Sequence, residues 1–160
     1  MNALLRPLPA LTDHKALRLA TLALLYCAQG LPIGLFQVAI PAYMASLGMT
    51  AAEVGGFIAF VFLPWSFKLV AGPIMDRFTF APMGNRRPWV LFAQSGLLLS
   101  FALLALLHPE PASQYWALAG LGFLSNVFSA LQDVAVDGLA VDILKADERA
   151  QGNAFMYGGQ

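Results

Sequence analysis

The stretch PWVLFAQSGLLLSFALLALL, residues 88–107, contains twenty residues and not one charged side chain. An α-helix rises about 1.5 Å per residue, so a helix of this length is about 30 Å long and matches the hydrocarbon core of a bilayer. Three further segments, at about 17–46, 52–75 and 115–144, are apolar and long enough to do the same. Another helix is expected to start near residue 151 and to run to residue 160. The sequence therefore predicts an all-α integral membrane protein with about four transmembrane helices and the start of a fifth.

The composition agrees with a lipid environment. Hydrophobic residues make up 59% of the 160-residue chain and charged residues only 11%, whereas soluble domains average about 45–50% and about 25%. The net charge is zero and no basic patch extends beyond short loops, which argues against a nucleic-acid partner. No His or Cys cluster has metal-ligand spacing, and no nucleophile or cofactor-binding constellation is present. We therefore expect a protein that is not an enzyme and needs no cofactor.

Basic residues predict how the chain crosses the membrane, because Lys and Arg concentrate on the cytoplasmic side. Eight of the nine fall in alternate connections: Arg6, Lys15 and Arg18 around an amino-terminal arm (1–16), Arg77, Arg86 and Arg87 in the second loop, and Lys145 and Arg149 in the fourth. The first and third connections carry none. We expect a multi-pass protein of the cytoplasmic (inner) membrane, with a cytoplasmic amino terminus, and residues 17–160 forming a partial transmembrane domain.

Local signals divide the helices. The first segment contains Gly30, Pro32 and Gly34, and a kink or tilt is expected there because proline removes a backbone donor. Thr50 and Glu53 form a capping-box pattern before the second helix. Small residues at four-residue spacing predict close helix packing in lipid. These small residues are Ala51, Gly55 and Ala59 in the second segment, and Gly96 and Ser100 in the third.

The ninth basic residue, Lys68, lies inside the second segment, where a charge is costly. The lysine could extend its stem to the headgroups, or it could face a carboxylate or a cavity. On the fourth segment, Asn126, Ser129, Asp133 and Asp137 share one helical face. We predict that Lys68 pairs with Asp133 or Asp137. Two readings of such a pair stay open: a static salt bridge that fixes helix packing, and a carboxylate that exchanges protons during transport.

Other polar residues lie at helical spacing on two more segments. Tyr26 and Gln37 are eleven residues apart and so predicted to share a face, with Gln29 nearby, and Asn153, Tyr157 and Gln160 follow one another at the start of the fifth helix. Together with the fourth segment they suggest a shared polar cavity. Ordinary hydrogen bonding between helices explains each stripe alone equally well.

One loop carries a family resemblance. The residues Gly72-Pro73-Ile74-Met75-Asp76-Arg77 and Gly84-Asn85-Arg86-Arg87 resemble the motif that joins the second and third helices in the major facilitator superfamily. Six residues, 78–83, are inserted between the two parts, as in the AmpG-type muropeptide permeases and their relatives in the acetyl-CoA transporter family. Three more stretches resemble the same subfamily: 29–32 with 41–43, 63–65 with Lys68, and 132–137 with 147–149.

The resemblance implies a secondary transporter that moves a small organic solute, muropeptide-like or related, by alternating access with a proton as the coupling ion. Members of the superfamily have about twelve helices in two halves, so we expect this chain to be an amino-terminal piece whose carboxyl-terminal half lies elsewhere in the protein. The resemblance also implies a cytoplasmic gate, formed by Gly72, Asp76, Arg77, Gly84, Arg86 and Arg87. In this reading Lys68, Asp133, Asp137, Asn126, Gln29, Gln37 and Tyr157 line the path of the solute and the proton.

Two observations limit the functional reading. Muropeptide permeases tend to have an arginine early in the fifth helix, where this chain reads Tyr157-Gly158-Gly159-Gln160, and this departure bears on the identity of the solute. A fold relative can also lose transport and serve as a membrane assembly or signalling factor. The charges inside the membrane favour the transporter, because a scaffold has little reason to carry them.

Overall fold

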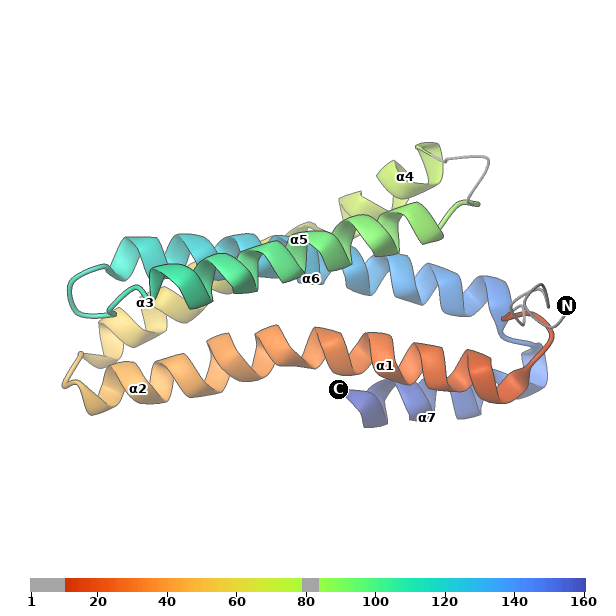
Figure 1. Cartoon of the computed structure of the whole chain (residues 1–160), viewed down its shortest axis with the longest axis horizontal. Helices are drawn as coiled ribbons and strands as arrows, with labels where there is room; N and C mark the ends of the chain where they lie inside the picture. Colours follow the sequence, from red (N-terminus) through yellow and green to blue (C-terminus); the bar gives the residue numbers. More distant parts are fainter. Residues whose placement is uncertain (1–10, 79–83) are drawn as a thin grey trace, which may run out of the picture.

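The computed structural model of the chain describes residues 11–78 and 84–160 and is nearly all helical (Figure 1). The first span combines α1 (Lys15–Ile33), η2 (Gly34–Ala39) and α2 (Ile40–Ser46), and the second combines α3 (Ala51–Phe62), η3 (Leu63–Phe67) and α4 (Lys68–Arg77). The third span is α5 (Arg87–Leu107) and the fourth is α6 (Tyr115–Ile143). A short η4 (Ala146–Glu148) leads into α7 (Arg149–Gly159). Arg6 in the predicted arm and residues 79–83 of the predicted insertion lie outside the described residues.

Four helical segments are long and apolar enough to cross a membrane, as the sequence predicts. They run over Lys15–Ser46, Ala51–Arg77, Arg87–Leu107 and Tyr115–Ile143. The start of α1, the end of α4, the start of α5 and the α6–α7 connection all lie at one end of the bundle (Figure 1). This arrangement agrees with the predicted alternation of basic and uncharged connections.

Local sequence signals start two helices, and the first is the predicted capping box. Thr50 accepts a hydrogen bond from the Glu53 amide (3.3 Å), and the Glu53 carboxylate accepts one from the Thr50 amide (2.7 Å), which completes the capping box. Pro88 stands in the first turn of α5, where its missing donor costs nothing. At the other end of α5, His108 adopts a left-handed conformation (φ 41°) and stops the helix.

The first span changes its helical type in the middle. After Pro32 the chain forms the π-helical segment η2 rather than a simple kink. A π-helix holds more residues per turn than an α-helix, so side chains beyond it leave the register that α-helical spacing assumes. The predicted shared face of Tyr26 and Gln37 is wrong for this reason: Tyr26 is buried, Gln37 is exposed, and Phe36 is buried in its place.

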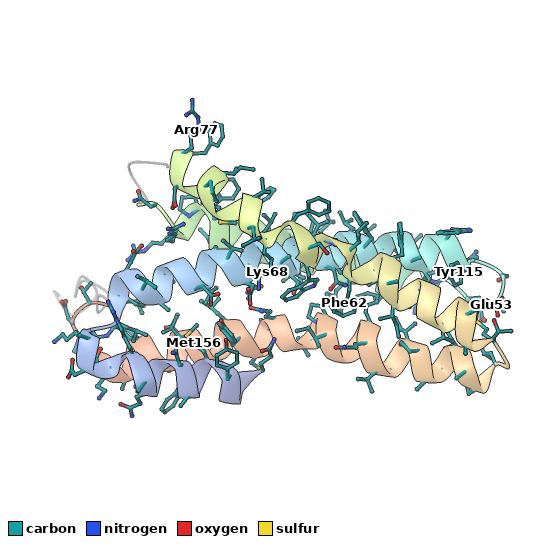
Figure 2. The ribbon with its side chains drawn as sticks, turned by 180° about the vertical axis from the view of Figure 1, so that it is seen from behind. Glu53, Phe62, Lys68, Arg77, Tyr115 and Met156 are labelled. Carbon is teal, nitrogen blue, oxygen red and sulfur yellow. The ribbon has the colours of Figure 1, made fainter. Side chains whose placement is uncertain are left out.

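The second span is broken, where the sequence analysis expected one continuous helix. Pro64 has no amide hydrogen and its ring crowds the preceding turn, so the α-helical ladder stops at Phe62 and a 3-10 turn follows. Lys68 is the first residue of the renewed helix α4. Figure 2 shows Lys68 at this bend, with Arg77 at the far end of α4, away from the rest of the bundle.

Helix α6 is the centre of the bundle. The helices α1, α3, α4 and α5 all pack against it, and α7 lies along α1 (Figure 1). Two apolar clusters result, one on each half of α6. The cluster toward the α7 end contains Leu22, Tyr26, Met75, Val136, Ala140, Leu144 and Met156 among others, and the other contains Phe36, Met44, Phe57, Val61, Leu118 and Ala119.

Of the two predicted small-residue faces, only one packs within the bundle. A Cβ added to Gly96 would lie 2.2 Å from the ring of Phe128 on α6, and the Ser100 and Ser125 hydroxyls are 3.0 Å apart across the same interface. The face of Ala51, Gly55 and Ala59 is exposed, and a Cβ at Gly55 would meet nothing within 4 Å. Glycine at position 96 is therefore what lets α5 and α6 approach closely.

A buried ion pair that the sequence analysis missed joins the first span to η4. The Arg18 guanidinium donates to both carboxylate oxygens of Glu148 (2.8 and 2.9 Å) and to the carbonyls of Leu11 and Thr12. Both charged side chains are at most 5% exposed. The Arg18 hydrogen bonds hold the pKa of the Glu148 carboxyl below its ordinary value, because they stabilise the ionised form.

A substitution tests the close approach of α5 and α6. Gly96→Ala in the full-length protein should lower the midpoint of thermal unfolding in detergent, since overpacking costs about 1–3 kcal/mol and exceeds the gain of about 1 kcal/mol from replacing a helical glycine. Gly55→Ala is the matched control, because its methyl group meets open space, and it should leave the midpoint equal or higher. Equal midpoints for the two variants would contradict the packing described here.

The pH dependence of stability tests the Arg18–Glu148 pair. A carboxyl whose pKa is lowered by folding stabilises the fold above its unfolded pKa, about 4.3 for Glu, and loses this effect as the pH falls through its folded pKa. Glu148→Gln should therefore lower the unfolding midpoint at pH 7, and the difference from wild type should shrink as the solution is acidified below about pH 4.

The control for this measurement is Asp147→Asn, which changes an exposed neighbouring carboxyl outside the pair. It should unfold at the wild-type temperature throughout the pH range. A Glu148→Gln deficit that stays constant from pH 7 to acid would mean that the charge of Glu148 is not what stabilises this connection.

Candidate functional site

Three spans meet at one carboxylate in the middle of the bundle. Lys68 at the start of α4 forms an ion pair with Asp133 of α6 through Oδ2, and Gln29 of α1 donates its side-chain amide to Oδ1 of the same group. The Asp133 side chain is 8% exposed and the Lys68 side chain 34%. An isolated charge at this depth would be costly, so the pairing satisfies both groups. Of the two predicted partners of Lys68, the structure selects Asp133.

The broken second span also supplies a residue that the sequence analysis did not assign to the site. The Lys68 ammonium lies 4.8 Å from the centre of the Trp65 ring, within range of a cation–π contact. Trp65 in turn donates its indole N–H to the side-chain carbonyl of Asn126 (2.8 Å). The available signal was the spacing of three residues between Trp65 and Lys68, which brings them together once the chain turns helically after Pro64.

Buried polar atoms surround this charge pair. Asn126 and Ser129 of α6 are fully buried, and Gln132 donates to the Leu25 carbonyl of α1 (2.6 Å). Among the described residues, the Gln29 carbonyl oxygen and the Ser129 hydroxyl have no hydrogen-bond partner. Polar atoms in such positions normally bind a protein group, water or a ligand. The predicted polar face of α6 thus turns inward and toward α1.

A second polar group lies one helical turn further along α6. The Tyr26 hydroxyl donates to Oδ1 of Asp137, and the ring of Tyr157 meets the Tyr26 ring edge-on at 5.9 Å between centroids. These side chains line a cavity of about 320 Å³ between α1, α6 and α7. The structure therefore places Asp137 and Tyr157 together, next to the Lys68–Asp133 pair. Gln37 belongs to neither group, since η2 carries it to the exposed surface.

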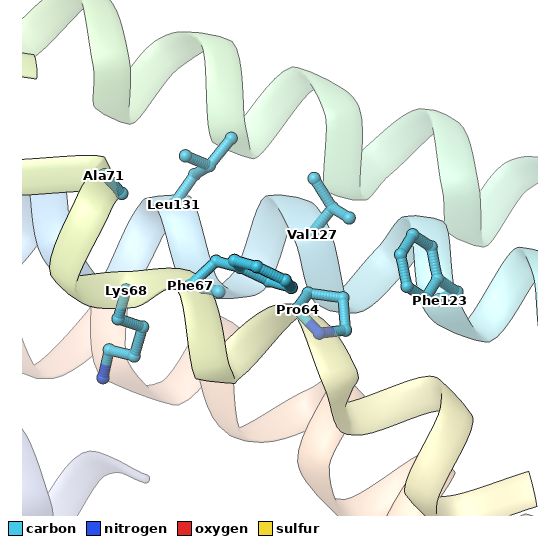
Figure 3. A pocket seen from close by; sticks show the side chains of 8 residues that line it. Pro64, Phe67, Lys68, Ala71, Phe123, Val127 and Leu131 are labelled. Carbon is cyan, nitrogen blue, oxygen red and sulfur yellow. The ribbon is translucent and has the colours of Figure 1, made fainter. Parts of the chain in front are cut away.

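A different cavity beside Lys68 is apolar. It measures about 160 Å³ and lies between the broken second span and α6, lined by Pro64, Phe67, Val127 and Leu131 among others. Figure 3 shows that the Lys68 nitrogen points away from these side chains. The charge of Lys68 is therefore directed to Asp133 and not to this pocket.

The predicted gate motif forms an ion-pair chain at the end of the bundle. Arg86 contacts Asp76 at 2.7 Å and Asp142 of α6 at 3.8 Å. A Cβ at Gly138 would lie 2.6 Å from the Arg86 side chain, so this glycine makes room for it. Gly84 has a left-handed backbone (φ 79°) that favours glycine, whereas a Cβ at Gly72 would meet nothing within 4 Å.

The remaining two arginines of the motif, Arg77 and Arg87, are exposed and have no ion-pair partner within residues 11–78 and 84–160. The contact of Asp142 with this motif was not predicted from the sequence. Arg86 is the residue that joins α4, α5 and α6 at this end.

Comparisons with known proteins agree with the fold and the motif. Residues 22–160 match the sequence model of the Major Facilitator Superfamily. The anhydromuropeptide permease of Escherichia coli (strain K12) is 35% identical over 138 residues, which cover 86% of this chain and 28% of that protein. An uncharacterized protein of Haemophilus influenzae is 29% identical over 140 residues, covering 84% of this chain and 32% of that protein. The chain thus spans about a third or less of the length of these relatives. With four membrane-spanning helices and a family match over most of its length, the chain belongs to the major facilitator superfamily as a multi-pass membrane protein.

Proposed function

We propose that this chain forms the amino-terminal part of a secondary transporter that moves a small organic solute, of the muropeptide type, across the cytoplasmic (inner) membrane. The family match supports a transporter, and the name of the Escherichia coli relative, anhydromuropeptide permease, supports the solute class. The share of that relative covered, 28%, supports a longer protein that supplies the carboxyl-terminal half. The basic connections at one end of the bundle favour a cytoplasmic amino terminus.

The observation that carries the mechanism is the buried Lys68–Asp133 pair with Gln29. In our proposal the protein is a symporter, and Asp133 takes up and releases the coupling proton. A proton on Asp133 removes its negative charge, and with it most of the attraction to Lys68. Because the three groups belong to three different spans, the charge state of Asp133 then biases how these spans pack. Alternating access follows if the solute path is open to one side of the membrane in one packing and to the other side in the second packing.

The ion-pair chain of Asp76, Arg86 and Asp142 is the proposed cytoplasmic gate. Arg86 joins the second and third spans to α6, the helix that also carries Asp133. A change in the position of α6 would therefore strain or release these contacts. Arg77 and Arg87 are exposed and are free to contact lipid headgroups or the other half of the transporter.

Substitution of the carboxylate tests the proton role. In the full-length protein, Asp133→Asn should abolish uptake driven by a pH gradient in proteoliposomes, because an amide cannot carry the proton. The matched control is Asp147→Asn, which removes an exposed carboxylate outside the spans and should keep wild-type uptake. Unchanged gradient-driven uptake by Asp133→Asn would reject the proton role.

A double variant separates this role from a static salt bridge. Removing one member of a buried pair leaves an uncompensated charge, which costs about 3–5 kcal/mol, and Asp133→Asn alone could fail for that reason. Lys68→Gln with Asp133→Asn removes both charges and should restore the thermal stability. If the pair only fixes packing, the double variant should still accumulate solute when a pH gradient is applied. If Asp133 carries the proton, the double variant should fold but should not accumulate solute under the same gradient.

Solvent access tests whether the bundle is a transporter or a dry scaffold for assembly or signalling. In a Cys27→Ser background, which removes the native free thiol, Tyr157→Cys should react with a membrane-impermeant thiol reagent applied in solution, because residue 157 lines the cavity about 12 Å into α7. Leu98→Cys, on the exposed apolar face of α5, should stay unlabelled. If neither cysteine is labelled, the result would favour the scaffold.

A further inference from the structure

The cavity between α1, α6 and α7 is lined by a cation and a carboxylate, neither of which the proton mechanism uses. Arg149, Asn153 and Tyr157 line it from α7, at successive spacings of four residues, so they follow one another along one face of that helix. Tyr26 and Asp137 line it from α1 and α6. The cavity thus holds one cation, one carboxylate, one amide and two phenol rings in about 320 Å³.

Each of these groups has capacity for a ligand. Arg149 is exposed and has no ion-pair partner among the residues that the structure describes. Its guanidinium presents a planar fork that fits a carboxylate with two hydrogen bonds. The Tyr26 hydroxyl occupies Oδ1 of Asp137, so Oδ2 can accept a hydrogen bond from a hydroxyl group. Asn153 can both donate and accept.

The aromatic lining adds a flat apolar surface. Tyr157 lines the cavity and is 70% exposed, and its ring packs against Tyr26 in a T-shaped pair, so much of the ring surface is available to a ligand. An aromatic face attracts the weakly positive C–H groups of a saturated ring, as it attracts the edge of another aromatic ring. The volume lies at the lower end of about 300–1,000 Å³ for small-molecule sites, which suits one sugar-sized unit.

We propose that this cavity binds a small hydroxylated carboxylate of the sugar-acid type, with Arg149 as the residue that selects for the carboxylate. Asp137 and Asn153 bind hydroxyl or amide groups of the same molecule, and Tyr157 packs on its ring. The proposal rests on the proposed function, since it describes where the transporter holds the acidic part of its solute. It adds a specificity site that lies next to the Lys68–Asp133 pair and uses different residues.

Two probes that differ by one acidic group test this assignment. N-acetylmuramic acid carries a lactyl carboxylate on a pyranose, and N-acetylglucosamine is the same sugar without it. By calorimetry on the purified full-length protein, the acid should bind at least about tenfold more tightly than the neutral sugar, as expected for one charge-assisted pair. Arg149→Gln should remove this preference, Arg149→Lys should keep part of it, and Tyr157→Ala should weaken both probes alike.

Lys145→Gln is the matched control, because it removes a cation near the same end of the molecule that does not line the cavity. It should preserve the preference for the acid. The assignment is overturned if wild type binds both probes equally or binds neither at millimolar concentration. It is also overturned if Arg149→Gln keeps the preference, or if Lys145→Gln loses as much of it as Arg149→Gln does.

Uptake measured in parallel separates the two proposals. If the protein binds the acid selectively but does not take it up in proteoliposomes, the proposed transport function is contradicted and the proposed binding site still stands. Uptake that proceeds while Arg149→Gln keeps the full preference for the acid would overturn the site and leave transport intact.

Discussion

The structure depends on one constraint: a charge inside a hydrocarbon layer must meet an opposite charge or a polar partner. Lys68 and Asp133 obey it by pairing, and Trp65, Asn126 and Gln29 complete the polar environment. The break that Pro64 causes in the second span serves this pairing. Pro64 interrupts the helix four residues before Lys68, and the renewed helix begins with the lysine beside α6. The break at Pro64 and the Lys68–Asp133 pair thus act together, because the break places Lys68 where Asp133 lowers the cost of burying its charge.

Much of this could be predicted from the sequence. Span number and approximate bounds follow from apolar length, which hydrocarbon thickness fixes, and the Lys68–Asp133 contact follows from the cost of an unpaired charge. The predictions that fail depend on backbone changes or on long-range packing, neither of which helical spacing encodes. Gln37 leaves the predicted face when η2 forms. The Arg18–Glu148 pair joins residues 130 positions apart, so only the folded structure, which brings η4 to the start of α1, could reveal it.

Helix α6 explains why two distinct polar groups lie so close together. Asp133 and Asp137 are one turn apart on it, and Gln29 and Tyr26 are one turn apart on α1, so the two helices meet as a ladder with one donor for each carboxylate. The donors are neutral, and Lys68 is the cation paired with Asp133. The ladder fixes the spacing of the two carboxylates along the interface, whichever group is charged.

That spacing has an electrostatic consequence for the proposed mechanism. Two carboxylates one turn apart repel each other when both are ionised, and in a site of low dielectric constant the repulsion is much stronger than in water. In the proposed mechanism, a ligand group that donates to Asp137 stabilises its negative charge, and the repulsion from that charge favours a proton on Asp133. Conversely, a proton on Asp133 removes the repulsion that Asp137 experiences. If the cavity binds solute and Asp133 carries the proton, as proposed, the two are coupled through the Coulomb interaction between neighbours on one helix, and by linkage each changes the affinity for the other by the same factor.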